Sequence, residues 1–345
     1  MVIPVVEINS LGSGFMDELL KQKADLLAEN YMILKKNFKW ESCLVNHFGA
    51  MVHTTKGVRA DPDLLRDVRK HLKEQTSWVS QFRGTNLQII SSLLCLEDNY
   101  KQLFSNTADL YGRLRDAGFH YSTQLPLSAF TIAKTAPAQE WDHRIDRMKA
   151  FYKKMRENHF WITSTDDYVH AAILATTDMD VDSTSEEIES CYHTLNRGGM
   201  YKGNYLQTLS HVLALGEEET RLKCHKAITI FKELKDRKCN LNYHGLASVG
   251  VLSLIAPDTD KIVEEVKQVC DYIYAKEGYG FWSLDRNIRS ILAASLVSDY
   301  YLESVEKGLL QVTLGNSIAA IIIAQQTAAI SAAAAASASA AAASS

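Results

Sequence analysis

The hydrophobic positions of this chain recur at helical spacing from one end to the other. In residues 15–36, for example, Leu20, Ala24, Leu27, Tyr31 and Leu34 fall three or four positions apart. Such spacing places apolar side chains on one face of an α-helix. No stretch alternates apolar and polar residues convincingly, as half-buried strands do, so we predict an all-α fold.

The same order of elements returns seven times along the chain. A long amphipathic helix ends in a basic residue, a short polar loop carries one large apolar residue, and a small-residue helix follows. Aligning these apolar anchors gives intervals of 40 or 41 residues for Phe38, Trp78, Phe119, Phe160, Met200, Leu241 and Phe281. A fixed period of this length indicates a repeat architecture. We therefore expect about seven helical hairpins with buried anchors.

The two helices of each hairpin differ in character. The helix after the anchor is short and rich in Ala, Ser and Leu, whereas the helix before it is longer and has a charged face. This contrast predicts two layers, with the short helices inside, arranged as either a closed α/α toroid or an open α-solenoid. The expected helices span residues 15–36, 44–52, 62–74, 87–95, 98–116, 126–133, 141–157, 167–176, 185–197, 205–215, 218–236, 243–256, 260–276 and 288–297.

The two ends of the chain fall outside this pattern. Residues 1–15 lack the basic and apolar regions of a secretion signal, and the helical pattern begins only at Met16. We expect 1–15 to be a disordered extension, 16–315 to be a single repeat domain, and 316–345 to be an Ala/Ser-rich apolar tail. A membrane anchor and fibre-like self-association are alternatives for the tail. Alanine contributes little to membrane insertion, so we favour a helix that docks on the repeats and then becomes disordered.

Charge and cysteine content narrow the class of protein. The 37 basic and 41 acidic residues are spread evenly along the sequence and give a net charge of -4. Nucleic-acid-binding proteins usually carry a clustered basic surplus, so we do not expect nucleic acid as partner, and the alanine-rich tail gives no reason to expect a membrane. The six cysteines lie far apart and form no metal-binding pair, which is typical of reduced thiols. These features favour a cytoplasmic protein.

Two resemblances concern the whole chain. The opening Met16-Asp-Glu-Leu-Leu-Lys-Gln-Lys-Ala-Asp-Leu-Leu and the Ala/Ser-rich end resemble a helical family of unknown function from Gram-positive bacteria, which implies no activity. Glu277-Gly-Tyr-Gly-Phe-Trp282 and Arg197-Gly-Gly-Met200 resemble the repeat of α/α toroids of the prenyltransferase and terpene cyclase type. That likeness implies a ring whose inner helices start at a central cavity. The acid motif and zinc ligands of those enzymes do not map onto this sequence, so their chemistry is not implied.

A third resemblance is to pentatricopeptide repeats, in Phe151-Tyr-Lys-Lys-Met155 and Phe231-Lys-Glu-Leu234. Those repeats bind RNA, one base per repeat. They are shorter than the period found here, and the acidic balance of the chain argues against RNA.

Candidate binding residues lie between the anchors and the following helices. Because the repeats are in register, these segments should share one rim of the protein, where free helix N–H groups also point. The rim could bind a small polar or anionic ligand, or its residues could simply cap helices. The members we single out are Asp166, Asp167, Lys202, Asn242, His244, Trp282, Asp285 and Arg286.

Two further sets carry possible chemistry. His170 and His211 occupy similar positions on adjacent inner helices and could face each other across a cavity, although a lone histidine there is more often a core residue. Asp178, Asp180, Asp182 and Glu189 have the oxygen spacing of a calcium-binding loop, but Ser183 stands where the sharp turn needs glycine. We favour a capped acidic helix start and expect no metal there.

No motif of a common cofactor-binding or hydrolase class is present: there is no GxGxxG, P-loop, GxSxG or HExxH. The function most consistent with the sequence is a binding or scaffold module without a cofactor, for an unidentified protein or small-molecule partner. The alternative is an α/α-toroid enzyme or ligand-binding protein with a polar central cavity. Whether the chain is an enzyme stays open, and the absence of a recognised catalytic motif argues against it.

Overall fold

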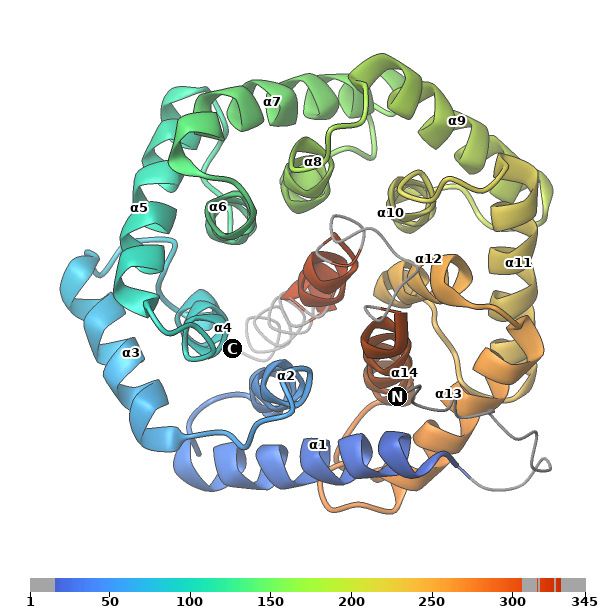
Figure 1. Ribbon diagram of the computed structural model, residues 1–345, viewed down its shortest axis with the longest axis horizontal. Helices are drawn as coiled ribbons and strands as arrows, with labels where there is room; N and C mark the ends of the chain where they lie inside the picture. The colour runs from blue at the N-terminus through green and yellow to red at the C-terminus, as the bar shows by residue number, and fades with distance from the viewer. Residues whose placement is uncertain (1–15, 306–314, 316, 326, 330–345) are drawn as a thin grey trace, which may run out of the picture.

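The computed structural model describes residues 16–305, 315, 317–325 and 327–329, and the secondary structure in this part is helical throughout (Figure 1). The all-α prediction is confirmed. The expected extension 1–15 and the end of the expected tail, 330–345, lie outside the described residues.

The helices form two layers around a common centre (Figure 1). Long helices make the outer layer: α1 (Glu18–Asn37), α3 (Pro62–Gln75), α5 (Tyr100–Asp116), α7 (Trp141–Asn158), α9 (Val181–Arg197), α11 (Thr220–Asp236) and α13 (Thr259–Tyr274). Inside them stand α2 (Cys43–Thr54), α4 (Thr85–Leu94), α6 (Leu125–Thr135), α8 (Tyr168–Ala175), α10 (Asn204–Leu213), α12 (Leu246–Ile255) and α14 (Arg286–Val305).

The first hairpin packs against the last, so the arrangement is a ring (Figure 1). Helix α1 contacts both α13 and α14. Lys23 of α1 donates to Asp299 of α14 over 2.7 Å, and both side chains are largely buried. Nearby, the Tyr279 ring packs edge-on against Tyr31, with 5.5 Å between the ring centroids. Separating the two ends of the ring would leave a buried charge without its partner, which is strongly destabilising, so this contact favours the closed ring.

The inner helices pack closely because their contact positions are small. Ala171, Ala172 and Ala175 of α8 have no exposed surface. In α12, a Cβ at Gly250 would lie 2.7 Å from Cγ1 of Val212 in α10, closer than packed carbon atoms come. The Ala- and Gly-rich composition therefore lets neighbouring inner helices approach each other.

The prediction of buried anchors is correct for some hairpins and wrong for others. Four anchors are buried, namely Phe38, Phe119, Met200 and Leu241, but Trp78, Phe160 and Phe281 are 85%, 54% and 67% exposed. Buried side chains stand near the exposed anchor in two of these hairpins, Phe82 in the second and Tyr279 in the seventh. In the fourth, the partly buried His159 ring packs 4.3 Å from Tyr192.

Several helix boundaries differ from the prediction, for local reasons. Helix α9 begins at Val181 rather than at residue 185, because Asp180 caps it by accepting a hydrogen bond from the backbone N–H of Ser183. Short 3-10 turns, η2 (Thr165–Asp167) and η3 (Tyr243–Gly245), precede α8 and α12 and delay their start. Helix α14 runs to Val305, well beyond the expected residue 297.

The described part of the tail lies within the ring (Figure 1, red). Residues 317–325 are helical, and Ile318 and Ile321 are buried. Ser248 of α12 donates a hydrogen bond to Gln325 over 2.8 Å. The tail thus brings side chains of its own to the centre of the ring.

Candidate functional site

The loops that lead from each outer helix to the next inner helix lie together at one end of the ring. Contacts between neighbouring loops and helix starts run around the whole circumference. They join Lys35 with Glu277, Glu41 with Arg69, Asn86 with Thr123, His120 with Tyr168, Thr163 with Gln207, Tyr205 with His244, and Asn242 with Asn287. The predicted rim is therefore a continuous structural feature.

Four of the predicted site residues line one cavity of about 290 Å³. Asp166 and Asp167 come from the turn before α8, His170 from α8, and His244 from the turn before α12. The rest of the wall is formed by Gln124, Val169, Asn204, Tyr205, Thr208, Ala247, Ala324, Gln325 and Ala328. We call this the polar cavity. It lies between three consecutive inner helices and the tail.

Asp167 is the most distinctive residue of the polar cavity. One carboxylate oxygen, Oδ2, accepts a hydrogen bond from the backbone N–H of Ser164 over 2.8 Å, which completes a capping box at this helix start. The other, Oδ1, is buried and has no hydrogen-bond partner among the described residues. Burial raises the pKa of Asp167 to about 7, and the charge of Asp166 adds to the effect. At neutral pH this carboxyl group can hold or release a proton.

The predicted histidine pair is brought together. The rings of His170 and His211 lie 5.7 Å apart, on α8 and α10. His170 lines the polar cavity, whereas His211 is buried behind it and has no partner for either ring nitrogen among the described residues. Burial lowers the pKa of His170 to about 4 and that of His211 well below its ordinary value, so both are neutral at neutral pH.

The remaining predicted rim residues lie elsewhere. Asn242, Asp285 and Arg286 line a second, more open hollow beside η3 and the start of α14. Asp285 accepts hydrogen bonds from the backbone N–H groups of Asn287 and Ile288, so it acts as a helix cap. Lys202 and Trp282 are exposed and line neither hollow. The eight candidates thus separate into two hollows and an exposed remainder.

Sequence reasoning missed several residues of the polar cavity. Asn204 and Tyr205 open α10, at the kind of helix start where the rim was predicted, so the repeat pattern itself could have pointed to them. The Tyr205 ring packs edge-on against His244 with 4.9 Å between centroids. Gln325 comes from the tail, and nothing in the repeat pattern indicates where that segment docks.

The acidic loop before α9 uses its carboxylates in separate contacts. Asp178 pairs with Arg144 over 2.9 Å, Asp182 with Lys154 over 2.7 Å, and Glu189 with His159 over 3.0 Å, while Asp180 caps the helix. Within the described ranges, no three His, Cys, Asp or Glu side chains are grouped so that they could hold a metal ion.

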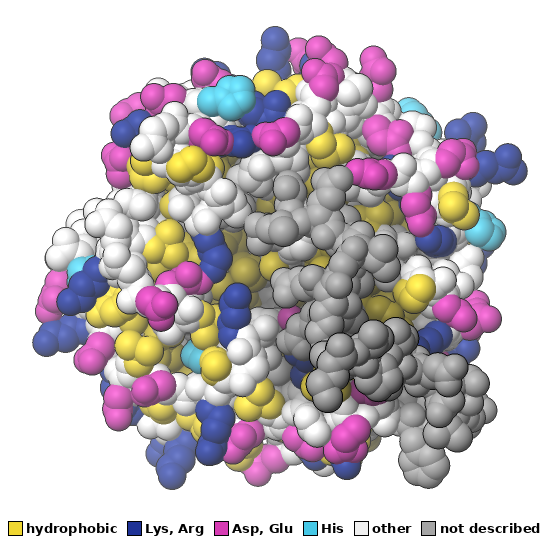
Figure 2. Space-filling model, viewed as in Figure 1, with side chains coloured by type: hydrophobic (Ala, Val, Ile, Leu, Met, Phe, Trp, Pro, Cys, Tyr) yellow, Lys and Arg dark blue, Asp and Glu magenta, His cyan; other side chains and the backbone are white. Residues whose placement is uncertain are grey.

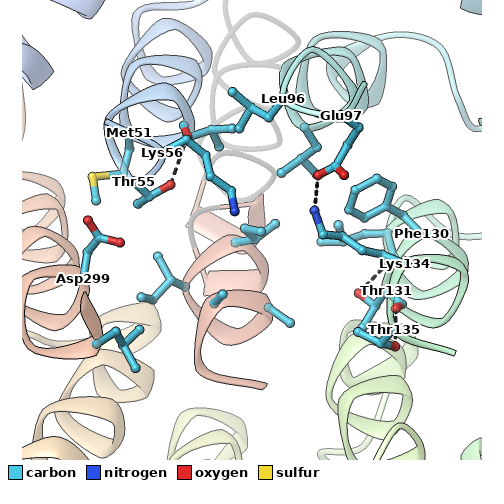
Figure 3. Close-up of a pocket in the computed structure, with 18 residues that line it drawn as sticks. Met51, Thr55, Lys56, Leu96, Glu97, Phe130, Thr131, Lys134, Thr135 and Asp299 are labelled. Carbon is cyan, nitrogen blue, oxygen red and sulfur yellow. Dashed lines mark hydrogen bonds and ion pairs between the residues drawn. The ribbon is translucent and has the colours of Figure 1, made fainter. Parts of the chain in front are cut away.

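A second cavity, of about 190 Å³, lies near the opposite ends of the inner helices (Figure 3). Its walls are mainly apolar and include Met51, Leu96 and Phe130, as well as Ile322 and Ile323 from the tail. Figure 3 shows Lys56 and Lys134 extending into the space, with Lys134 paired to Glu97. Figure 2 shows apolar side chains in a hollow inside the ring, with Lys or Arg side chains beside it. The cavity could hold an apolar group with an acidic end.

The chain is similar to proteins whose function is not assigned. Residues 30–327 match the family described as "Protein of unknown function (DUF4003)". The uncharacterised protein YeaA of Bacillus subtilis (strain 168) is 25% identical over 303 residues, which cover 84% of this chain and 87% of that protein. No solved structure matches the chain. In the described residues, no helix has both the length and the apolar character needed to cross a membrane. The predicted resemblance is confirmed, and the chain belongs to this helical family of unknown function.

Proposed function

We propose that the protein binds a small polar ligand in the polar cavity, and that this ligand donates hydrogen bonds, as an amine or a polyol does. The observation that carries the proposal is Oδ1 of Asp167. It is buried at the cavity wall and has no hydrogen-bond partner among the described residues. A buried acceptor without a partner costs about 1–3 kcal/mol, and a ligand that donates to it would recover that energy.

The rest of the wall supports a ligand that carries several donors and also an acceptor, because Gln325 Nε2 is a buried donor without a partner among the described residues. Asn204 Oδ1 is a second buried acceptor without a partner among the described residues. Among the described lining residues none is Lys or Arg, whereas Asp166 and Asp167 are both present. Such a wall favours a cationic or neutral ligand over an anion. The Tyr205 ring adds an aromatic surface on which an ammonium group can rest.

The second cavity, whose walls are mainly apolar, supports a ligand less well, because most of its charged groups are already paired. Lys134 pairs with Glu97, and Asp299 pairs with Lys23. A ligand there would have to compete with these ion pairs, whereas the polar cavity offers acceptors that await a donor.

Two functions considered from the sequence differ from this proposal in what they require. An α/α-toroid enzyme would use Asp167 as an acid or base, and its pKa of about 7 fits such a role. A scaffold would bind a macromolecular partner on its surface and leave the cavity unused. We favour a ligand-binding protein of the cytoplasm, because a bound ligand alone accounts for the unpartnered acceptors and no reaction is needed to explain them.

The proposal is tested by native mass spectrometry of freshly purified protein beside the same sample after denaturation. We expect a small mass that leaves on denaturation, is lost in Asp167→Asn and is kept in Asp178→Asn, whose side chain is exposed far from the cavity. In parallel, thermal unfolding is followed with spermidine, glucosamine and inositol added singly.

Two results would contradict the proposal. One is a bound mass that Asp167→Asn does not affect. The other is the absence of any bound mass together with no change in the melting temperature for all three compounds.

A further inference from the structure

The end of the ring that carries the outer-to-inner loops also carries exposed aromatic side chains, at least one in every hairpin. We call it the aromatic end and define it by the segments 34–42, 72–84, 113–124, 155–167, 194–203, 233–245 and 271–285. Nine aromatic side chains in its loops are at least 54% exposed: Trp40, Trp78, Tyr121, Phe160, Trp161, Tyr201, Tyr243, Phe281 and Trp282. Among the described residues every exposed aromatic side chain belongs to these segments, Tyr274 included. The exposed large hydrophobic side chains outside these segments are all aliphatic: Leu19, Val58, Leu64 and Leu222.

Tryptophan shows the bias most clearly. Of the five tryptophans in the chain, Trp141 is buried, and the other four lie at the aromatic end with at least 85% of their surface exposed. Large exposed apolar groups that gather at one place mark an interaction surface. At this end the backbone also departs from its preferred conformations, because Tyr243 has φ of 53° while its ring is exposed. Strain of this kind favours a functional surface over an unconstrained loop.

Cations are interleaved with these rings and are available for a partner. Six exposed lysines at this end form no ion pair with any described residue: Lys36, Lys39, Lys73, Lys202, Lys235 and Lys238. Arg115 lies over the Tyr121 ring at 3.6 Å and Arg156 over the Phe160 ring at 5.1 Å. Several acidic side chains of the same segments are occupied. Glu41 pairs with Arg69 and Glu277 with Lys35.

We propose that the aromatic end docks on an anionic phospholipid bilayer, with the axis of the ring perpendicular to the membrane. Trp and Tyr prefer the boundary between acyl chains and headgroups, and lysines next to them are attracted to anionic headgroups. Contacts join neighbouring loops all the way around a closed ring (Figure 1), so a surface laid on this end of the ring can meet the loops of every hairpin. This is surface attachment and needs no spanning helix. It departs from the expectation of no membrane partner, which rested on the low insertion tendency of the alanine-rich tail.

Nucleic acid is the alternative that shares this chemistry, because bases also stack on aromatic rings and phosphates also attract lysine. The arrangement favours the bilayer. The aromatic end carries fourteen Lys and Arg against eleven Asp and Glu, a small surplus, whereas single-stranded nucleic acid is normally bound in a strongly basic groove.

The experiment is vesicle flotation of the full chain with two kinds of liposome, one of phosphatidylcholine alone and one that also contains phosphatidylglycerol. Tryptophan fluorescence is recorded in parallel, and it reports on this end because four of the five tryptophans lie there. We expect flotation with the anionic liposomes, a shift of the emission to shorter wavelength, and release at high salt.

Two variants make the test specific. Replacing Trp40, Trp78, Trp161 and Trp282 with Ala should weaken binding about tenfold or more, since each buried ring contributes to insertion. The matched control replaces the exposed aliphatic residues Leu19, Val58, Leu64 and Leu222 with Ala, and its affinity should stay within about twofold of the parent because these side chains lie elsewhere. Circular dichroism confirms that both variants are folded.

Three outcomes would overturn the inference. The first is no flotation with either liposome. The second is flotation that the tryptophan variant retains in full. The third is that a single-stranded oligonucleotide, or a second copy of the chain in sedimentation velocity, causes the emission shift when anionic liposomes do not.

Discussion

The two ends of the ring differ in both charge and exposed apolar surface. The acidic end, where inner helices lead into outer ones, consists of segments 16–21, 55–65, 95–103, 136–144, 176–184, 214–223 and 256–262 and carries sixteen Asp and Glu against eight Lys and Arg. The aromatic end has the opposite sign and carries the exposed rings. Figure 2 looks down the axis of the ring and shows charged side chains of both signs around its circumference.

Helix energetics explain the charge difference but not the aromatic residues. All outer helices start at the acidic end, where their N-termini favour carboxylates, and finish at the aromatic end, where their C-termini favour cations. Their N-cap residues are Asp17, Asp61, Asn99, Glu140, Asp180, Glu219 and Asp258. No such rule places Trp, Tyr and Phe in water. The difference between the ends therefore separates residues that stabilise the fold from residues kept for a partner.

The comparison is tested most strongly at two phenylalanines in the same position of the repeat. Phe119 is buried against the Tyr168 ring, whereas Phe281 is 67% exposed. We expect Phe119→Ala to lower the free energy of unfolding by about 3–5 kcal/mol, because it leaves a cavity. Phe281→Ala is the matched control and should lower it by less than about 1 kcal/mol. Chemical denaturation measures both, and equal losses would show that the two anchors do not differ as described.

This pair also shows how much of the fold the sequence contained. The period, the all-α class and the division into long and short helices follow from the spacing of apolar residues, because the geometry of a helix fixes that spacing. The burial of each anchor does not follow from the sequence. Phe82 is buried while Trp78 is exposed, and Tyr279 is buried while Phe281 is exposed, and which side chain of each pair is buried depends on packing.

For the candidate site, the sequence indicated Asp166, Asp167, His170 and His244 through their place in the repeat. It could not indicate Gln325, whose position depends on where the tail docks, nor the difference in charge between the ends. Acidic and basic segments alternate along the chain. They come to opposite ends of the ring only in the folded protein, because successive helices run in opposite directions.

A smaller effect concerns the pH dependence contributed by the polar cavity. The pKa of Asp167 is about 7 in the folded protein against 3.8 as its ordinary value. The folded state thus holds this proton more tightly, so the stability that Asp167 contributes is complete below about pH 4 and is lost as the pH rises through 7. Asp167→Asn cannot ionise, so this loss should disappear. At about pH 8 its free energy of unfolding should exceed that of the parent by up to about 4 kcal/mol, and at about pH 4 the two should be equal.

Denaturation at both pH values measures this difference. A gain of equal size at the two pH values would mean that the substitution acts through packing and not through ionisation, and the proposed burial of the charge would be wrong.

At the acidic end, single caps should have effects of about 1 kcal/mol. Asp258 accepts hydrogen bonds from the backbone N–H groups of Asp260 and Lys261 at the start of α13. Asp258→Ala should lower the free energy of unfolding by about 1 kcal/mol, whereas Asp258→Asn, which keeps a capping oxygen, should cost only a few tenths. If both variants lose the same amount, the charge and not the capping hydrogen bonds is what stabilises this helix start.

The smallest expected effect on stability is the most informative about the aromatic end. Trp40 is fully exposed, so Trp40→Ala removes almost no buried surface and should change the free energy of unfolding by less than about 0.5 kcal/mol. Trp141, buried at the start of α7, is the internal standard, and Trp141→Ala should lower it by about 3–5 kcal/mol. A ring that can be removed without loss of stability has no role in holding the fold, yet its exposure to water is unfavourable. A large loss of stability in Trp40→Ala would instead mean that the aromatic end packs on itself, and the contrast between the two ends would then concern folding rather than binding.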